Sequence, residues 1–291
     1  MEKIETLEAH AGQIPALAFT PDCRRLISAG MDNLVKLWSV RDWTTVATLE
    51  GHEKSVNALA LAPDGQVLAT GSSDTTVRLW DLAKLQLAQT LQDRKKVVST
   101  VTISAEGKWV VAGSYGGRAA VWSLDGREVV AFKASDKNLS AAALSPQGDL
   151  LATAGLGGEI RVWEIPSGAP VQTLSGHRTA VPSVAFTSGG QRMVSLGYEG
   201  TIRVWNTDTW DRERTMTLGV EGPRRLVVSP DGRQAALGLE GRVEIWDATS
   251  WGRLDELEMS TTATGGLAFS SDGLWFAAGG ADGKVQIWRL Q

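Results

Sequence analysis

The stretch from residue 68 to residue 81 reads Leu-Ala-Thr-Gly-Ser-Ser-Asp-Thr-Thr-Val-Arg-Leu-Trp-Asp, and it decides the fold because it recurs along the chain. Its tryptophan is one of seven that follow one another at intervals of 41 or 42 residues. The seven are Trp38, Trp80, Trp122, Trp163, Trp205, Trp246 and Trp288. A fixed period of this length indicates an array of units, none of which can bury its apolar face without its neighbours.

Each repeat unit is made of short apolar runs separated by turn residues. In the second unit, the run 56–61 is closed by Pro63-Asp64-Gly65, and a similar turn follows the corresponding run in most other units. Alternating runs of this kind, rich in Val, Ile and Leu, are typical of β-strands. No segment shows a sustained helical period. We therefore predict four short antiparallel strands per unit, with the recurring tryptophan on the third.

With this period and these strands, the chain resembles the WD-repeat β-propeller family, whose blades have four strands and about 40 to 45 residues. The resemblance extends over the whole chain, although some family marks are absent. The Trp-Asp pair survives only at Trp80-Asp81 and Trp246-Asp247, and the Gly-His pair only at Gly51-His52 and Gly176-His177, with Ala9-His10 as a near match. The resemblance implies an all-β, seven-bladed propeller that occupies residues 1–291 as a single domain.

The two ends of the chain predict how the ring closes. The last unit stops just after Trp288, so it lacks a fourth strand of its own. Residues 3–8 match the fourth strands of other units, such as 46–49 and 171–174. We expect this N-terminal segment to supply the fourth strand of the seventh blade, which removes an exposed sheet edge.

Composition and charge narrow the class of protein. The net charge is −4 and the pI is about 5.5, without a long run of one sign, which argues against nonspecific binding to nucleic acid. Charged residues interrupt every apolar stretch before it reaches membrane-spanning length, and the first apolar residues belong to the closing strand rather than to a signal peptide. Cys23 is the only cysteine. We expect a monomeric, cytoplasmic protein that binds neither nucleic acid nor membrane.

The three histidines occupy the same place in their repeats, just before the first strand. The resemblance implies that each one joins a hydroxyl, a carboxylate and the repeated tryptophan in a hydrogen-bonded tetrad, which satisfies buried polar groups. The tetrads are His10, Ser28, Asp32 and Trp38 in the first blade, His52, Thr70, Asp74 and Trp80 in the second, and His177, Ser195, Glu199 and Trp205 in the fifth. The other blades lack a complete set; the sixth offers Gly219, Ala236, Glu240 and Trp246.

A Ser/His/Asp set is also typical of hydrolases. Here it recurs in three blades with a structural explanation in each, and Cys23 has neither a second cysteine nor a free histidine to act with it. We therefore predict no catalytic residue, no metal and no cofactor. Two alternatives remain: an enzyme or small-ligand binder that uses the central channel, and a propeller domain taken from a larger multidomain protein.

For partner binding, the resemblance implies the face that carries the loops around the central channel. Large side chains occupy the position before the turn acid in several blades, and both tyrosines of the chain fall there. The residues that flank the start of the first strand add two polar candidates, and lysines and arginines nearby favour an acidic segment of a protein or peptide. The predicted partner-binding residues are Tyr115, Tyr198, Arg224, Met31, Leu156, Leu239 and Asn57. The alternative is that these side chains merely cover the channel mouth.

A second set of aromatic residues lies in the turns of the opposite face. Trp43, Trp210 and Trp251 each follow the repeated tryptophan of their blade by five residues. They either fold back over their own blades or form a second contact surface.

Overall fold

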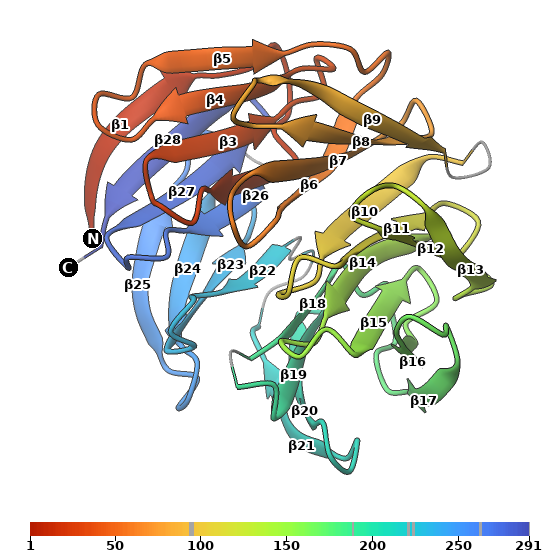
Figure 1. Ribbon diagram of the computed structural model, residues 1–291. Helices are drawn as coiled ribbons and strands as arrows, with labels where there is room; N and C mark the ends of the chain where they lie inside the picture. Colours follow the sequence, from red (N-terminus) through yellow and green to blue (C-terminus); the bar gives the residue numbers. More distant parts are fainter. Residues whose placement is uncertain (93–95, 188, 220–221, 223–224, 262–263, 291) are drawn as a thin grey trace.

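A computed structural model describes residues 1–92, 96–187, 189–219, 222, 225–261 and 264–290. These residues form 28 strands, arranged as seven four-stranded antiparallel sheets around a ring (Figure 1). The expected all-β, seven-bladed propeller is therefore confirmed. No helix long and apolar enough to cross a membrane occurs in the described part of the chain.

The strands of each blade follow one another from the channel outward. The first blade contains β2 (Ala16–Phe19), β3 (Arg25–Ala29), β4 (Val35–Ser39) and β5 (Thr45–Leu49). The second contains β6 (Val56–Leu61), β7 (Val67–Ser72), β8 (Thr76–Asp81) and β9 (Gln86–Gln92). The third contains β10 (Val98–Ile103), β11 (Trp109–Ser114), β12 (Arg118–Ser123) and β13 (Glu128–Lys133). The fourth contains β14 (Leu139–Leu144), β15 (Leu150–Gly155), β16 (Ile160–Glu164) and β17 (Pro170–Leu174).

The remaining three blades follow the same plan. The fifth contains β18 (Ser183–Phe186), β19 (Arg192–Gly197), β20 (Thr201–Asn206) and β21 (Arg212–Thr217). The sixth contains β22 (Arg225–Val228), β23 (Gln234–Gly238), β24 (Arg242–Asp247) and β25 (Arg253–Glu258). The seventh contains β26 (Thr264–Phe269), β27 (Trp275–Gly280), β28 (Lys284–Arg289) and β1 (Glu2–Glu8).

The ring closes as the sequence predicts. Strand β1 pairs with β28 in antiparallel register, with Leu7 opposite Val285, so both ends of the chain lie in one sheet (Figure 1). Leu7 is buried in the cluster between the seventh and first blades, whereas Ile4 faces solvent.

The core consists of apolar layers between neighbouring blades. The repeated tryptophan of each blade packs against the blade before it: Trp80 lies against Ile27 and Leu37 of the first blade, and Trp38 lies against Ala277 and Ile287 of the seventh. This arrangement explains the period in the sequence, because each blade must present one large aromatic side chain to its predecessor.

The turn between the first two strands of a blade requires a left-handed residue. Gly65 fills this position in the second blade with φ 69°, and its N–H donates to the Ala62 carbonyl oxygen at 2.9 Å. In the first blade Cys23 occupies the same position with φ 56°, a conformation that glycine adopts more easily. Cys23 therefore takes a turn position that the other blades give to glycine.

The three turn tryptophans fold back over their blades. Trp43, Trp210 and Trp251 have φ values of 57°, 59° and 59°, and each lies against the apolar layer of its region. The Trp43 ring also meets the Trp275 ring edge-on at 5.3 Å. These contacts favour the packing interpretation over a second contact surface.

Candidate functional site: the face around the central channel

The tetrad of the second blade is a continuous chain of hydrogen bonds. Trp80 Nε1 donates to Thr70 Oγ1 at 2.8 Å, Thr70 Oγ1 lies 2.8 Å from His52 Nε2, and His52 Nδ1 lies 2.7 Å from Asp74 Oδ2. Asp74 also accepts hydrogen bonds from the Glu53 backbone N–H and the Thr76 hydroxyl. The chain joins the blade core to the loop before β6 and to the turn after β7.

The other two tetrads have the same geometry. In the first blade, His10 Nε2 lies 2.8 Å from Ser28 Oγ and His10 Nδ1 lies 2.8 Å from Asp32 Oδ1, while Trp38 Nε1 donates to Ser28 at 2.9 Å. In the fifth blade the corresponding distances for His177, Ser195, Glu199 and Trp205 are 2.8, 2.6 and 2.9 Å. The longer Glu199 side chain thus reaches the histidine as the aspartates do.

The hydrogen bonds of the tetrads are compatible with a neutral form of each histidine. Because the indole N–H donates to the hydroxyl oxygen, the hydroxyl hydrogen is free to point at His Nε2, which then acts as an acceptor, and Nδ1–H donates to the carboxylate. Burial lowers the pKa of His10, His52 and His177, although their carboxylate partners oppose this change. Neutral imidazole is therefore the form that completes each tetrad.

The pKa values of two tetrad carboxylates are lowered, whereas burial alone would raise them. Burial would raise the pKa of Asp74, but hydrogen bonds from Thr76 and His52 lower it to about 2. Hydrogen bonds from Thr179, Thr201 and His177 likewise outweigh the effect of burial on Glu199 and lower its pKa to about 2. Both carboxylates are ionised at neutral pH.

A catalytic serine must be reached by its substrate, and these hydroxyls are not accessible. Ser28, Thr70 and Ser195 are each 0% exposed, and each accepts a hydrogen bond from an indole N–H. The hydroxyl–histidine–carboxylate order is that of a hydrolase triad, but it is enclosed between strands. The geometry fits the structural role that the sequence predicts.

The glycine of the Gly-His pair makes room for a basic side chain. A Cβ atom on Gly51 would lie 2.1 Å from Nη1 of Arg78, and one on Gly176 would lie 2.0 Å from Nη1 of Arg203. In the first blade the pair is Ala9-His10, and the basic residue is Lys36, whose Nζ donates to the Ala9 carbonyl oxygen at 2.6 Å. Alanine is tolerated there because an ammonium group needs less space than a guanidinium.

The sixth blade anchors its tryptophan differently. Trp246 Nε1 donates to Glu244 Oε2 at 3.2 Å, and Glu244 forms ion pairs with Arg242 at 3.1 Å and Arg253 at 3.5 Å. Glu244 lies two residues before the tryptophan, where Lys36, Arg78 and Arg203 stand in the tetrad blades. A buried carboxylate thus replaces the hydroxyl as acceptor.

Four of the predicted partner-binding residues are exposed at the channel face. Met31, Tyr115, Leu156 and Tyr198 have exposed fractions of 46%, 45%, 52% and 37%. Their backbone N–H groups donate to the loops that precede the first strands, at Gln13, Val97, Asn138 and Ala180. These hydrogen bonds place the four side chains on the loop side of the ring, around the channel mouth.

The expectation that Leu239 is exposed is wrong. Its side chain is 3% exposed and packs with Leu226 and Leu237. The hairpin between β23 and β24 is one residue shorter than its counterparts: Ala235 pairs with Trp246, 11 positions away, whereas Leu68 pairs with Trp80, 12 positions away. Counting back from the tryptophan therefore misplaces residues of β23.

The same shortening corrects the predicted set for the sixth blade. Thr70 pairs with Arg78 in the second blade, and in the sixth it is Leu237, not Ala236, that pairs with Glu244. An apolar leucine thus occupies the hydroxyl position of this blade.

Asn57 is used within the ring rather than left free on the face. Its Nδ2 donates to the Val98 carbonyl oxygen of the next blade at 2.8 Å and to Ser73 Oγ at 3.0 Å. Ser99 and Ser140 make equivalent bonds to Leu139 and Val181. Side chains at this position therefore tie neighbouring inner strands together. Arg224 lies outside the described residues.

The inner strands enclose a cavity of about 360 Å³ along the central channel. Five blades line it, through β6, β10, β14, β18 and β22, and Arg225 is the one ionisable side chain among the described residues of its wall. The sequence contains a signal for this residue. In each blade a turn follows the inner strand, and Arg225 stands four positions before the first residue of that turn. At the same position the other six blades carry only small side chains. They are Ala16, Ala58, Thr100, Ala141, Ser183 and Gly266.

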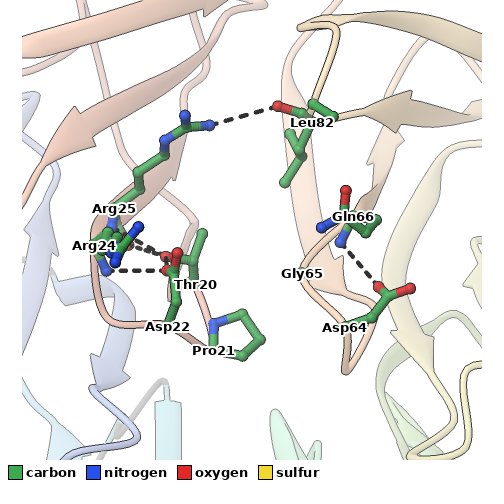
Figure 2. Close-up of a pocket in the computed structure, with 10 residues that line it drawn as sticks. Thr20, Pro21, Asp22, Arg24, Arg25, Asp64, Gly65, Gln66 and Leu82 are labelled. Carbon is green, nitrogen blue, oxygen red and sulfur yellow. Dashed lines mark hydrogen bonds between the residues drawn. The ribbon is translucent and has the colours of Figure 1, made fainter.

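A second cavity, of about 250 Å³, lies on the opposite face between the first two blades. Figure 2 shows the Arg25 side chain reaching across it toward the Leu82 carbonyl oxygen, at 3.5 Å, while Asp22 accepts hydrogen bonds from Thr20 and the Arg24 backbone N–H. The Asp22 carboxylate and the Arg25 guanidinium at this cavity are thus engaged by the protein itself.

Comparison with known proteins agrees with the fold. The family model "WD domain, G-beta repeat" matches residues 1–39, 43–81, 85–123, 126–164, 168–206 and 258–289. The chain therefore belongs to the WD-repeat family, whose propellers are typically non-enzymatic and generally serve as protein-interaction scaffolds.

Individual relatives align over parts of the chain. Human transducin beta-like protein 2 is 30% identical over 129 residues, which cover 38% of this chain and 29% of the human protein. The uncharacterized WD repeat-containing protein sll1491 of Synechocystis is 33% identical over 113 residues, covering 38% of this chain and 32% of that protein. The U3 snoRNP-associated protein-like EMB2271 of Arabidopsis thaliana is 28% identical over 115 residues, covering 33% and 24%. The chain thus spans less than a third of the length of these relatives.

Proposed function

We propose that the chain is a non-enzymatic, monomeric interaction module of the cytoplasm that binds a protein or peptide on the face around the channel. The observation that carries this proposal is the exposure of Met31, Tyr115, Leu156 and Tyr198 at one repeat position in four blades. Aromatic and large apolar side chains that remain accessible next to a concave opening are the usual anchors of protein interfaces.

Charge on the same face supports an acidic partner segment. Lys54, Lys96, Lys137 and Arg178 lie in the loops that precede the first strands, together with Glu53 and Asp136. A basic face on a chain with a net charge of −4 would guide an acidic segment to the anchors and speed association.

The experiment compares two double variants. Tyr115→Ala with Tyr198→Ala removes two anchors, whereas Leu87→Ala with Leu254→Ala removes two side chains of similar exposure from outer strands. We expect capture of partners from the source cell, followed by measured affinities, to show a loss of about 2 kcal/mol, roughly 30-fold, only for the tyrosine variant. Both variants should unfold at the temperature of the unaltered protein. Equal binding by both variants would refute this face.

The non-enzymatic part has its own test. Ester and peptide hydrolysis should show no activity that depends on His10, His52 or His177, because the hydroxyl beside each imidazole is enclosed. Any hydrolysis that disappears on substitution of one of these histidines would overturn this part. Sedimentation would test the monomeric state.

A further inference from the structure

Arg225 is a half-buried, charged side chain in the wall of the channel, and it has no hydrogen-bond or ion-pair partner among the described residues. It is the first residue of β22, so it lies at the end of the channel that opens onto the face of Tyr115 and Tyr198. Its guanidinium makes no hydrogen bond or ion pair with any residue that the structure describes. Burial lowers its pKa, and no nearby carboxylate opposes that change. A guanidinium that is partly withdrawn from water and unpaired among the described residues is a candidate group for binding an anion.

The surroundings of Arg225 indicate what that ligand is. The described wall of the cavity contains no acidic residue, so no carboxylate of that wall neutralises the arginine. Thr100 and Thr102 line the same cavity, and neither hydroxyl has a hydrogen-bond partner among the described residues. The remaining lining is mostly aliphatic, as at Leu59, Val101 and Val184. These features together fit a ligand with one negative charge, which the guanidinium and the hydroxyls would bind, and a small apolar part, which the walls would contact.

We propose that the mouth of the central channel is a carboxylate-binding site in which Arg225 is the recognition residue. A guanidinium binds a carboxylate through two parallel N–H donors, a geometry that lysine does not offer. A phosphate would carry up to two charges and is usually held by a cluster of arginines, whereas the described wall of this cavity has one. The cavity volume, about 360 Å³, suits a small ligand or a single inserted side chain.

Two sources of carboxylate share this chemistry: a free small acid, and a glutamate or aspartate side chain of a bound peptide. The site goes beyond the proposed function, because a free acid would bind Arg225 whether or not the tyrosines contact a protein. The experiment therefore uses acetate and a capped Gly-Glu-Gly peptide separately, with chloride and a capped Gly-Gln-Gly peptide as their controls.

The readout is the Nε–Hε signal of Arg225 in protein labelled with ¹⁵N-arginine, assigned by its disappearance in Arg225→Gln. We expect saturable shifts with acetate at constant ionic strength and none with chloride. Arg41→Gln, which alters an exposed arginine on the opposite face, should leave those shifts unchanged. Binding of acetate alone would identify a small-acid site, and binding of the glutamyl peptide as well would identify a site for a partner side chain. No saturable shift with either would overturn the proposal.

Stability distinguishes a ligand site from a structural arginine. Arg225→Thr introduces the residue that the third blade carries at this position. In buffer without carboxylates, this variant should unfold at the same or a higher temperature, because the half-buried guanidinium makes no hydrogen bond or ion pair with a described residue. Acetate at ten times its dissociation constant should raise the folded-to-unfolded ratio of the unaltered protein about 11-fold and should not change that of the variant. A variant that unfolds at a clearly lower temperature would show that Arg225 is structural and would refute the site.

Discussion

The second and sixth blades have the same four-stranded form but different internal chemistry. In the second, a chain of hydrogen bonds runs from Trp80 through Thr70 and His52 to the Asp74 carboxylate. In the sixth, Leu237 stands at the hydroxyl position and the tryptophan bonds to Glu244. The family model matches the second blade and leaves residues 207–257 unmatched. The fold thus depends on the spacing of strands and tryptophans, and the tetrad is an addition to it.

The difference also concerns function. The sixth blade carries Arg225 where the other inner strands have small residues, and it has replaced the usual basic residue on its third strand with Glu244. The sixth blade therefore differs from the second both in the group that anchors its tryptophan and in the charge that it brings to the channel wall.

The largest loss of stability should follow removal of β1, the strand that holds all blades in one ring. Deletion of residues 2–8 exposes the edge of β28 and uncovers Leu7 contacts worth about 1.5 to 3 kcal/mol, besides the lost strand pairing. We expect aggregation or a large fall in unfolding temperature, measured by calorimetry. Hydrogen exchange should show early opening in the seventh and sixth blades and late opening in the second. An unchanged unfolding temperature would contradict closure by β1.

Replacing His52 tests how much the tetrad adds to a blade. His52→Ala removes one buried hydrogen-bond partner from Thr70 and one from Asp74, which should lower the free energy of unfolding by about 1 to 3 kcal/mol in urea titrations. The control is Ser135→Ala, at the corresponding place in the fourth blade, where the side chain accepts a hydrogen bond from only the Lys137 backbone N–H. An equal effect of the two substitutions would show that the tetrad is not specially stabilising.

Acid should weaken the tetrad blades first. A histidine whose pKa is lowered on folding binds its proton more readily when unfolded, so stability falls as the pH drops below about 6.5. The limiting slope is about 1.4 kcal/mol per pH unit for each histidine. The pKa values of Asp74 and Glu199 are lowered to about 2 in the folded protein. These carboxylates therefore add a further loss of stability only as the pH falls below their pKa values in the unfolded chain, about 4.

The matched variant for this pH dependence is His52→Gln. It removes one of three shifted histidines and should reduce the slope between pH 6.5 and 4.5 by about one third. The measurement is the free energy of unfolding in urea at closely spaced pH values. A slope that is the same with and without His52 would mean that other groups govern the acid response.

The sequence allowed most of the fold to be predicted because its information is periodic. Seven tryptophans with constant spacing define the blades, and the repeated Thr-Leu-x-x-His pattern identifies residues 3–8 as a closing strand. The tetrads were predictable because their four members recur at fixed separations. The burial of Leu239 was not predictable, because the hairpin between β23 and β24 is one residue shorter and shifts positions that are counted back from the tryptophan. Arg225 was not, because its isolation depends on what lies across the channel, which spacing alone does not reveal.

The smallest expected effect concerns the ion pairs that take the place of the tetrad in the sixth blade. Glu244→Gln keeps an acceptor for the Trp246 N–H but removes the charge that pairs with Arg242 and Arg253. Both arginines are partly exposed, so solvent screens these pairs, and we expect a loss of about 0.5 to 1 kcal/mol. High salt should reduce the stability difference between Glu244→Gln and the unaltered protein, whereas it should leave the effect of His52→Ala nearly constant, because the tetrad is buried and mainly hydrogen-bonded. If salt changed both effects equally, the distinction between a hydrogen-bonded second blade and an ion-paired sixth blade would fail.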